Sequence, residues 1–381
     1  MKIVIAADKF KHSLSSFAFC KAVKEGLQAA DPAFDITCLP LADGGDGLAE
    51  VMAYYSSFLK VEETVSDPLG QPVKATYLYS EEQSLAFIEM AAASGLQLLQ
   101  PSQFNCAITS TYGTGELVKK AIQRGAKELI VGVGGSATHD CGIGMAAALG
   151  WRFLDSNGVA LKPIGENLLH IHTIDTTARL DLGHVTVKVA CDVTNYLTGP
   201  QGAARVYGPQ KGATPLMVEQ LEEGMLHFAA VVKKQVGTDI KNIRGGGAAG
   251  GMGAGCVLFL NAAIISGAEL IFQYSNAEAH IQKADMVITG EGRLDEQTLN
   301  GKLVAAVTKL CHKHQKPVIA LCGTVDLPPE KWQECGLSAA FSIVNKPMKL
   351  EEALLNAAAL LTESAFAVGN LLKGSVGLRG F

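Results

Sequence analysis

Glycine-rich loops with acidic, basic or hydroxyl side chains recur along the chain, and each follows an apolar stretch with the pattern of a β-strand. Loops at the carboxyl ends of parallel strands are where α/β proteins bind their ligands. These loops therefore predict that several chain segments contribute to one ligand site. Their candidate residues are Asp8, Lys11, Asp43, Ser110, Thr111, Gly134, Gly135, Ser136, Asp192, Gly250, Gly251, Arg293 and Asp295.

The chemistry that suits this set is phosphoryl transfer. That reaction needs backbone N–H groups for phosphate oxygens, carboxylates for Mg²⁺, cations for developing negative charge, and one carboxylate that accepts a hydroxyl proton. The loops supply each of these groups. A P-loop site is disfavoured, because Gly301-Lys302 is followed by Leu303 and no glycine stands five residues before Gly301.

Residues 128–155 favour a different chemistry when they are considered alone. An apolar strand pattern runs into Gly132-x-Gly134-x-x-Ala137, and Asp155 follows in the position of a ribose-binding acid. This stretch predicts a nicotinamide-dependent oxidoreductase of a small hydroxy acid as the main alternative. Against it, Gly142 and Gly144 would weaken the regular helix of such a unit. A loop of backbone donors suits any phosphate, and Asp155 would then be an ordinary turn residue.

Structural roles compete with these assignments. A single Asp beside Gly or Thr is most often a turn or N-cap residue, which applies to Asp43 and Asp192 taken one at a time. Lys11 is equally consistent with a solvated lysine. Arg293 could form an ion pair with Asp295, but a functional role is favoured because the flanking glycines have no packing value. A third function, a regulatory protein that binds a sugar acid without chemistry, is disfavoured by the number of acids near glycine loops.

Two further segments, Gly245–Gly255 and His139-Asp140, each allow a functional and a structural interpretation. The run Gly245–Gly255 is either a hinge or a place where the backbone approaches a nucleotide. His139 beside Asp140 would suit a base and its orienting acid, but a capping or solvated histidine is favoured.

Composition excludes several classes of protein. The 381 residues are enough for two domains with full cores. The net charge of −5 gives no basic surface for nucleic acid or anionic lipid, so a small substrate is expected. The nine cysteines occur singly without a C-x-x-C motif, which favours reduced core residues and a cytoplasmic location. No apolar run approaches the length of a membrane span.

Strand and helix patterns alternate at both ends of the chain, whereas alternating patterns near 73–89 suggest antiparallel strands in the middle. Such alternation predicts a doubly wound parallel sheet. The sequence therefore predicts an α/β fold with two domains: a discontinuous doubly wound domain at 1–66 plus 264–381, and an α/β domain inserted at 67–263. The expected strands are Lys2–Ala6, Ile36–Leu39, Leu59–Val65, Val73–Tyr79, Leu85–Glu89, Val185–Cys191, Met286–Thr289, Val318–Cys322 and Ala340–Val344, with helices at 215–235, 300–314 and 350–372.

A series of motifs occurs in the order known from one family. They include Asp8…Phe10-Lys11…Ser13, Leu41-Ala42-Asp43-Gly44-Gly45-Asp46-Gly47, Glu89-Met90-Ala91, Ser110-Thr111-Tyr112-Gly113-Thr114-Gly115, Gly134-Gly135-Ser136-Ala137-Thr138, Ala190-Cys191-Asp192-Val193, Tyr207-Gly208-Pro209-Gln210-Lys211-Gly212, Gly250-Gly251-Met252-Gly253 and Thr289-Gly290-Glu291-Gly292-Arg293-Leu294-Asp295. With these motifs the chain resembles the bacterial glycerate kinase family over nearly its whole length.

The resemblance implies an ATP-dependent kinase that phosphorylates D-glycerate with Mg²⁺, usually at the 2-hydroxyl, in glyoxylate or sugar-acid metabolism. Phosphorylation at the 3-hydroxyl is the alternative within the family. The resemblance also implies a flavodoxin-related inserted domain and an active site between the domains. No nucleic-acid or membrane partner is expected, and the assembly, for which a homodimer is one option, is left open.

Residue roles follow from the resemblance as expectations. Asp192 would accept the hydroxyl proton or bind Mg²⁺, for which Asp43 is a second ligand. Lys11, Arg293 and Asp295 would complete the catalytic set. Asp8, Asp43, Ser110 and Thr111 would bind substrate, and Gly134, Gly135, Ser136, Gly250 and Gly251 would bind phosphate. The chain departs from the family pattern at Lys9, His12, Asp46-Gly47-Leu48 and His139-Asp140-Cys141-Gly142, where Ser, Gly, Glu-Gly-Thr and Asn-Asp-Gly-Gly are usual.

Overall fold

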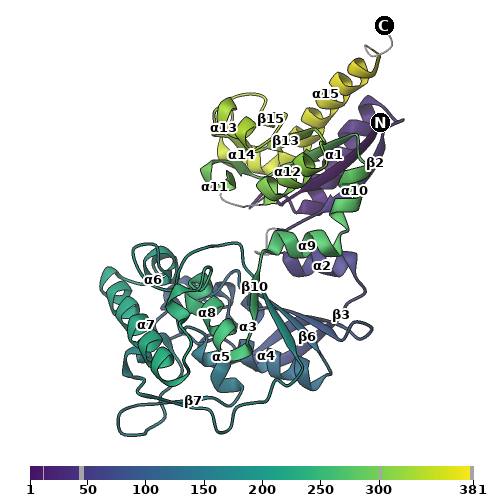
Figure 1. Cartoon of the computed structure of the whole chain (residues 1–381). Coiled ribbons are helices and arrows are strands. Elements are labelled where there is room, and N and C mark those ends of the chain that lie inside the picture. Colours follow the sequence, from purple (N-terminus) through teal and green to yellow (C-terminus); the bar gives the residue numbers. More distant parts are fainter. Residues whose placement is uncertain (12, 43–46, 300–302, 378–381) are drawn as a thin grey trace. The chain divides into compact units, whose positions relative to one another are not determined.

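The computed structural model describes residues 1–11, 13–42, 47–299 and 303–377. It divides into two compact units, each with its own sheet and core. The discontinuous unit comprises Met1–Asp43 and Gly267–Phe381, and the inserted unit comprises Gly44–Ser266. In Figure 1 the purple N-terminal and yellow C-terminal segments both belong to the discontinuous unit.

The discontinuous unit is built on a parallel sheet. Its described strands lie in the order β15-β13-β11-β1-β2, which is the order of a flavodoxin-like doubly wound sheet with a switch point between β1 and β11. The strands are β1 (Lys2–Ala7), β2 (Asp35–Pro40), β11 (Met286–Thr289), β13 (Val318–Cys322) and β15 (Ala339–Ser342), with a separate pair β12 (Arg293–Leu294) and β14 (Thr324–Val325). The helices are α1 (Ser16–Ala30), α9 (Gly267–Tyr274), α10 (Ala277–Lys283), α11 (Glu296–Leu299), α12 (Leu303–Lys313), α13 (Pro329–Glu334), α14 (Leu350–Leu355) and α15 (Ala357–Gly377).

The two ends of the chain pack together through α1 and α15. Ser15 caps α1 by accepting a hydrogen bond from the Ala18 N–H at 3.2 Å. A Cβ at Gly26 would lie 2.3 Å from the Thr362 carbonyl oxygen, so the absence of a side chain permits the close helix contact. The apolar faces of both helices then join the buried residues of β1 in one core.

The inserted unit has a mixed sheet in the order β10-β9-β6-β5-β4-β3, in which β5, β6, β9 and β10 are parallel and β3-β4-β5 are antiparallel. The strands are β3 (Leu59–Ser66), β4 (Pro72–Ser80), β5 (Leu85–Glu89), β6 (Glu128–Gly132), β9 (Thr186–Ala190) and β10 (Ala263–Ile265), with a separate pair β7 (Arg152–Leu154) and β8 (Thr173–Asp175). The helices are α2 (Leu48–Tyr55), α3 (Ala91–Ser94), α4 (Tyr112–Gln123), α5 (Ile143–Ala148), α6 (Ala203–Tyr207), α7 (Pro215–Gln235) and α8 (Ala248–Leu260); a short 3-10 turn, η4, spans Pro209–Lys211.

The fold confirms the α/β class with parallel sheets and differs from the expectation in three details. The flavodoxin strand order is found in the discontinuous unit, whereas the parallel strands of the inserted unit follow one another in chain order. The described residues 47–66 cluster with the inserted unit, because β3 pairs along its whole length with β4. The expected helix at 350–372 is two helices, which separate at Asn356.

Both interpretations of Gly245–Gly255, a hinge and a backbone approach to a nucleotide, stay predictions. Most of the run belongs to α8, a buried helical segment in which Ala249, Gly250 and Gly251 have left-handed backbone angles. Among the described residues, no helix combines the length and the apolar character needed to cross a bilayer.

Candidate functional site

The first group of functional residues lies at the carboxyl edge of the discontinuous unit, at the switch point between β1 and β11. The Asp8 N–H donates to the Gly290 carbonyl at 3.2 Å, so the loops after the two strands run side by side. Asp8 is buried, and its Oδ1 accepts the Lys9 N–H at 2.8 Å. Ligands of doubly wound sheets bind at this point of the fold. The structure therefore brings Asp8 beside the loop that carries Arg293 and Asp295.

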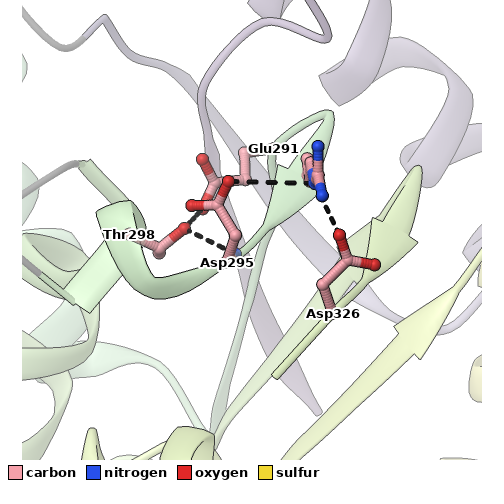
Figure 2. A network of polar contacts seen from close by, with 5 residues as sticks. Glu291, Asp295, Thr298 and Asp326 are labelled. Atoms are coloured by element: carbon pink, nitrogen blue, oxygen red, sulfur yellow. Dashed lines mark hydrogen bonds and ion pairs between the residues drawn. The ribbon is translucent and has the colours of Figure 1, made fainter.

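Arg293 belongs to a polar network with Asp295 and Asp326 that spans two loops of this unit. Figure 2 shows Glu291, Asp295, Thr298 and Asp326 of this network. The Arg293 Nε lies 2.5 Å from Asp326 Oδ2 and 3.8 Å from Asp295 Oδ2. Thr298 Oγ1 accepts the Asp295 N–H at 3.2 Å and donates to Glu291 Oε1 at 2.6 Å. The Arg293 side chain nevertheless remains 67% exposed. The acids thus hold the inner end of the guanidinium, and its outer end faces solvent.

The partner of Arg293 is mainly Asp326 and only secondarily Asp295, which sequence reasoning did not anticipate because 33 positions separate the pair. Glu291 is a further buried acid at this edge that was not singled out. Lys11 is exposed beside the same loops. Asp43 lies outside the described residues.

The second group lies at the carboxyl edge of the inserted unit. Asp192 follows β9, and its Oδ1 accepts the Ser266 hydroxyl at 2.7 Å. Ser266 follows the neighbouring strand β10, and the Cys191 N–H donates to the Ile265 carbonyl at 2.9 Å. This pairing of strand ends fixes the orientation of a half-buried carboxylate. Ser266 was not a candidate from sequence, since only the sheet order brings it to Asp192.

The Gly134–Ser136 loop follows β6 and offers backbone donors. Within the described parts of the chain, no residue accepts a hydrogen bond from the N–H groups of Gly134, Gly135 or Ser136. Gly135 has a left-handed backbone with φ 68°. The loop is held in place because the Leu96 N–H donates to the Gly135 carbonyl at 2.9 Å. Successive free N–H groups around a left-handed residue form an anion-binding concavity.

Behind this loop lies a buried lysine. Lys211 is 3% exposed, and its Nζ donates to Ser136 Oγ at 2.6 Å and to the Thr138 carbonyl at 2.9 Å. Burial lowers the pKa of Lys211 to about 8. Lys211 belongs to the motif Tyr207–Gly212, but the sequence predicted no role for it. Its contact with Ser136 spans 75 positions and is not visible in a local pattern.

His139 and Asp140 are both fully buried, so the solvated interpretation of His139 is wrong. Burial, together with the Lys211 charge, lowers the pKa of His139 well below its usual value. Asp140 accepts from the Thr111 N–H and hydroxyl, each at 2.8 Å, and from the N–H groups of Gly142 and Gly144. Burial raises the pKa of this carboxyl in spite of these bonds. The Asp140 carboxylate therefore joins Thr111 to the backbone at Gly142 and Gly144 by hydrogen bonds inside the unit.

Ser110 and Thr111 use their hydroxyls inside the inserted unit. The Ser110 hydroxyl donates to the Pro163 carbonyl at 2.8 Å. The Thr111 hydroxyl donates to Asp140 and accepts the Met145 N–H at 2.8 Å. The structure thus gives both residues a role in packing, and their contact with substrate stays a prediction.

Gly250 and Gly251 are buried in the start of α8. A Cβ at Gly250 would lie 2.1 Å from the Thr138 carbonyl oxygen, and one at Gly251 would lie 2.8 Å from Cys141 Sγ. These glycines allow two backbone segments to meet, and their contact with phosphate stays a prediction.

The dinucleotide interpretation of residues 128–155 also loses its support. Asp155 is half-buried, and its Oδ1 accepts the N–H groups of Asn157 and Val159, each at 2.8 Å. It is a turn residue, as the kinase interpretation expects. The helix α5 begins only at Ile143, which lies well beyond the glycine loop.

Magnesium would need oxygen ligands from these edges. No cluster of three or more His, Cys, Asp or Glu suited to a metal ion is found among the described residues. Proteins usually hold Mg²⁺ with one or two carboxylates while substrate phosphates and water supply the remaining ligands. The half-buried carboxylate of Asp192 fits that donor set.

Comparison with known proteins agrees with these features. The model of the glycerate kinase family matches residues 3–373. The chain is 41% identical over 375 residues to "Glycerate kinase" of Bacillus subtilis (strain 168), covering 98% of each chain. It is 41% identical over 359 residues to "Glycerate 2-kinase" of Escherichia coli (strain K12), covering 94% of each chain. A crystal structure of a protein provisionally named glycerate kinase 2, from Salmonella typhimurium LT2, has a TM-score of 0.85 and 41% identity over 99% of both chains.

Proposed function

Because the chain belongs to the glycerate kinase family, and is thus a kinase, we propose that it transfers the γ-phosphoryl group of ATP to the 2-hydroxyl of D-glycerate. The products are 2-phosphoglycerate and ADP. The name of the Escherichia coli relative supports transfer to the 2-position. A cytoplasmic location and a homodimer stay predictions.

The observation that supports the proposal most is the arrangement of two neighbouring strand ends in the inserted unit. Gly132 of β6 pairs with Ala190 of β9. Each strand therefore leads into its loop at the same edge of the sheet: Gly134–Ser136 with free N–H groups, and Asp192 with an oriented carboxylate. A donor loop for phosphate and an acceptor for a hydroxyl proton are two of the requirements of phosphoryl transfer.

The proposed steps use the residues as follows. Asp192 Oδ2 accepts the proton of the attacking hydroxyl, while the bond to Ser266 holds Oδ1. The N–H groups of Gly134–Ser136 bind phosphate oxygens. Arg293 and Lys11 bind the substrate carboxylate and compensate the charge that develops on the transferring group.

Magnesium, when bound, neutralises charge on the nucleotide phosphates. Asp192 and Asp43 are the proposed protein ligands. Asp8 and Asp295 are proposed to hold substrate hydroxyls or to orient the cations at their edge.

The test is a coupled ADP-release assay with ATP, Mg²⁺ and D-glycerate, followed by phosphorus NMR of the product. We expect glycerate-dependent ADP release and a 2-phosphoglycerate resonance. A 3-phosphoglycerate resonance would overturn the position of transfer alone. Binding of glycerate without ADP release would overturn the proposed reaction.

A further inference from the structure

The Lys211 ammonium is buried with neutral oxygen acceptors as its hydrogen-bond partners. Among the described residues it has two recorded acceptors, Ser136 Oγ and the Thr138 carbonyl, for three N–H donors. A buried charge is costly unless a counter-charge or hydrogen bonds compensate it. This ammonium is therefore well suited to stabilise an anion that binds close by.

The ammonium contacts the Gly134–Ser136 loop through Ser136 Oγ, and no acceptor among the described residues bonds to the N–H groups of that loop. Ser136 Oγ accepts the Lys211 proton, which leaves the serine O–H as a donor. Backbone hydrogen bonds hold both segments: the Leu96 N–H donates to the Gly135 carbonyl of the loop, and the Lys211 N–H donates to the Gly208 carbonyl at η4, each at 2.9 Å. A Cβ at Gly212, the residue after η4, would lie 2.2 Å from the Phe104 carbonyl oxygen, so this turn is closely packed.

We propose that Lys211 is a positioning residue for the phosphate loop: it holds Ser136 so that the serine O–H donates to a phosphate oxygen of the nucleotide. The ammonium also adds positive charge behind the loop. The inference rests on the proposed function for the identity of the ligand, a nucleoside di- or triphosphate. The bond between Lys211 and Ser136 is independent of it.

The titratable groups that interact with Lys211 are Cys106, His139 and Asp140. Burial raises the pKa of the Cys106 thiol and lowers the pKa of His139, so both are neutral near pH 8. Because the pKa of Lys211 is about 8, this side chain loses its positive charge as pH rises through 8. Most exposed lysines stay charged at that pH. Affinity for a phosphate ligand should therefore fall as pH rises from 7 to 9.

The experiment measures ADP binding by calorimetry in the absence of glycerate. Lys211→Met keeps the length of the side chain and removes the charge. We expect ADP to bind on the order of 10- to 100-fold more weakly to this variant, as for the loss of one charge-assisted hydrogen bond. The decline in affinity between pH 7 and 9 should also disappear. Lys127→Met, which removes an exposed lysine just before β6 begins, is the matched control and should bind ADP as the unaltered protein does.

Ser136→Ala and the double variant Lys211→Met/Ser136→Ala show whether Lys211 affects ADP affinity through Ser136. If Lys211 acts through Ser136, the losses in ADP affinity will be less than additive. Equal ADP affinity and an unchanged pH dependence in a folded Lys211→Met protein would overturn the proposal, and so would strict additivity. If Lys211→Met does not fold, Ser136→Ala decides: unchanged ADP affinity and pH dependence in that variant would overturn it.

The two proposals fail in different ways. A protein that binds ADP in a Lys211-dependent manner but does not phosphorylate glycerate would refute the proposed reaction alone. A protein that phosphorylates glycerate, with ADP affinity independent of Lys211, would refute the positioning role alone.

Discussion

Neighbouring side chains orient the charged groups of Asp192 and Arg293. The Ser266 hydroxyl holds one oxygen of the Asp192 carboxylate at 2.7 Å. Two acids hold the Nε side of Arg293, whose side chain remains largely exposed. In both cases one part of the charged group is fixed by a partner from a different loop. Orientation of this kind reduces the reorganisation that a reaction requires.

Asp192→Asn tests the proposed base. The amide cannot accept the hydroxyl proton, so we expect kcat to fall by about 10²- to 10⁴-fold. Steady-state kinetics at varied Mg²⁺ separate the two roles, since a lost ligand raises the Mg²⁺ requirement and a lost base does not. The control is Asp181→Asn, at an exposed turn of the same unit. Turnover near that of the unaltered protein would remove Asp192 from the mechanism.

Helix packing determines where the loops of the inserted unit lie. A Cβ at Gly115 in α4 would lie 2.3 Å from the Met145 carbonyl oxygen in α5. A Cβ at Gly144 would lie 2.2 Å from Ser110 Oγ and 2.6 Å from the Thr111 nitrogen. Gly144, one of the two glycines expected to weaken a helix here, is thus a contact point between α5 and the start of α4. Asp140 then ties the loop before α5 to the start of α4.

Gly144→Ala should therefore destabilise the inserted unit. The new methyl group forces a shift of backbone that is hydrogen-bonded to Asp140, and overpacking of this kind costs about 1–3 kcal/mol. Urea unfolding followed by fluorescence of the buried Trp151, in a Trp332→Phe background, measures the loss. In contrast, Gly374→Ala in α15 has open space around the new Cβ and should be neutral or slightly stabilising. Equal stability of Gly144→Ala and its parent would contradict the packing argument.

The molecule as a whole joins distant parts of the chain in two sheets. Many element limits agree with the sequence patterns, and β5, β11, β13 and α7 agree at both ends. The contacts between loops could not be predicted from the sequence patterns. Only the folded loops show that no described residue accepts from the N–H groups of Gly134–Ser136. The same holds for the buried contact between Lys211 and Ser136. Sequence periodicity carries no information about either. Full burial of His139 likewise depends on tertiary packing.

That burial makes stability depend on pH. The pKa of His139 is well below its usual value in the folded protein, whereas in the unfolded chain it is about 6.5. Below that pH the unfolded state binds a proton that the folded state does not, so the free energy of unfolding falls as pH falls. The slope from this residue approaches about 1.4 kcal/mol per pH unit.

His139→Asn is the comparison, because Asn is usual at this position in the family that the sequence resembles. Trp151 fluorescence in urea at pH 7.5, 6.5 and 5.5 gives the free energy of unfolding of each protein. We expect the unaltered protein to lose more stability than His139→Asn between pH 7.5 and 5.5. Parallel pH dependences would show that His139 does not contribute.

The sequence by itself determined the α/β class, most of the strands and the series of motifs that identifies the family. Side-chain periodicity and glycine-rich strand ends are local properties, so a linear pattern is enough to reveal them. Only the tertiary structure decided which residues share an edge or a core. It joined Ser266 to Asp192, Asp326 to Arg293 and Lys211 to Ser136, and it gave Gly250, Gly251 and Thr111 internal contacts, while their contacts with a ligand stay predictions. The physical reason is that hydrogen bonding and burial depend on contacts between segments far apart in the chain.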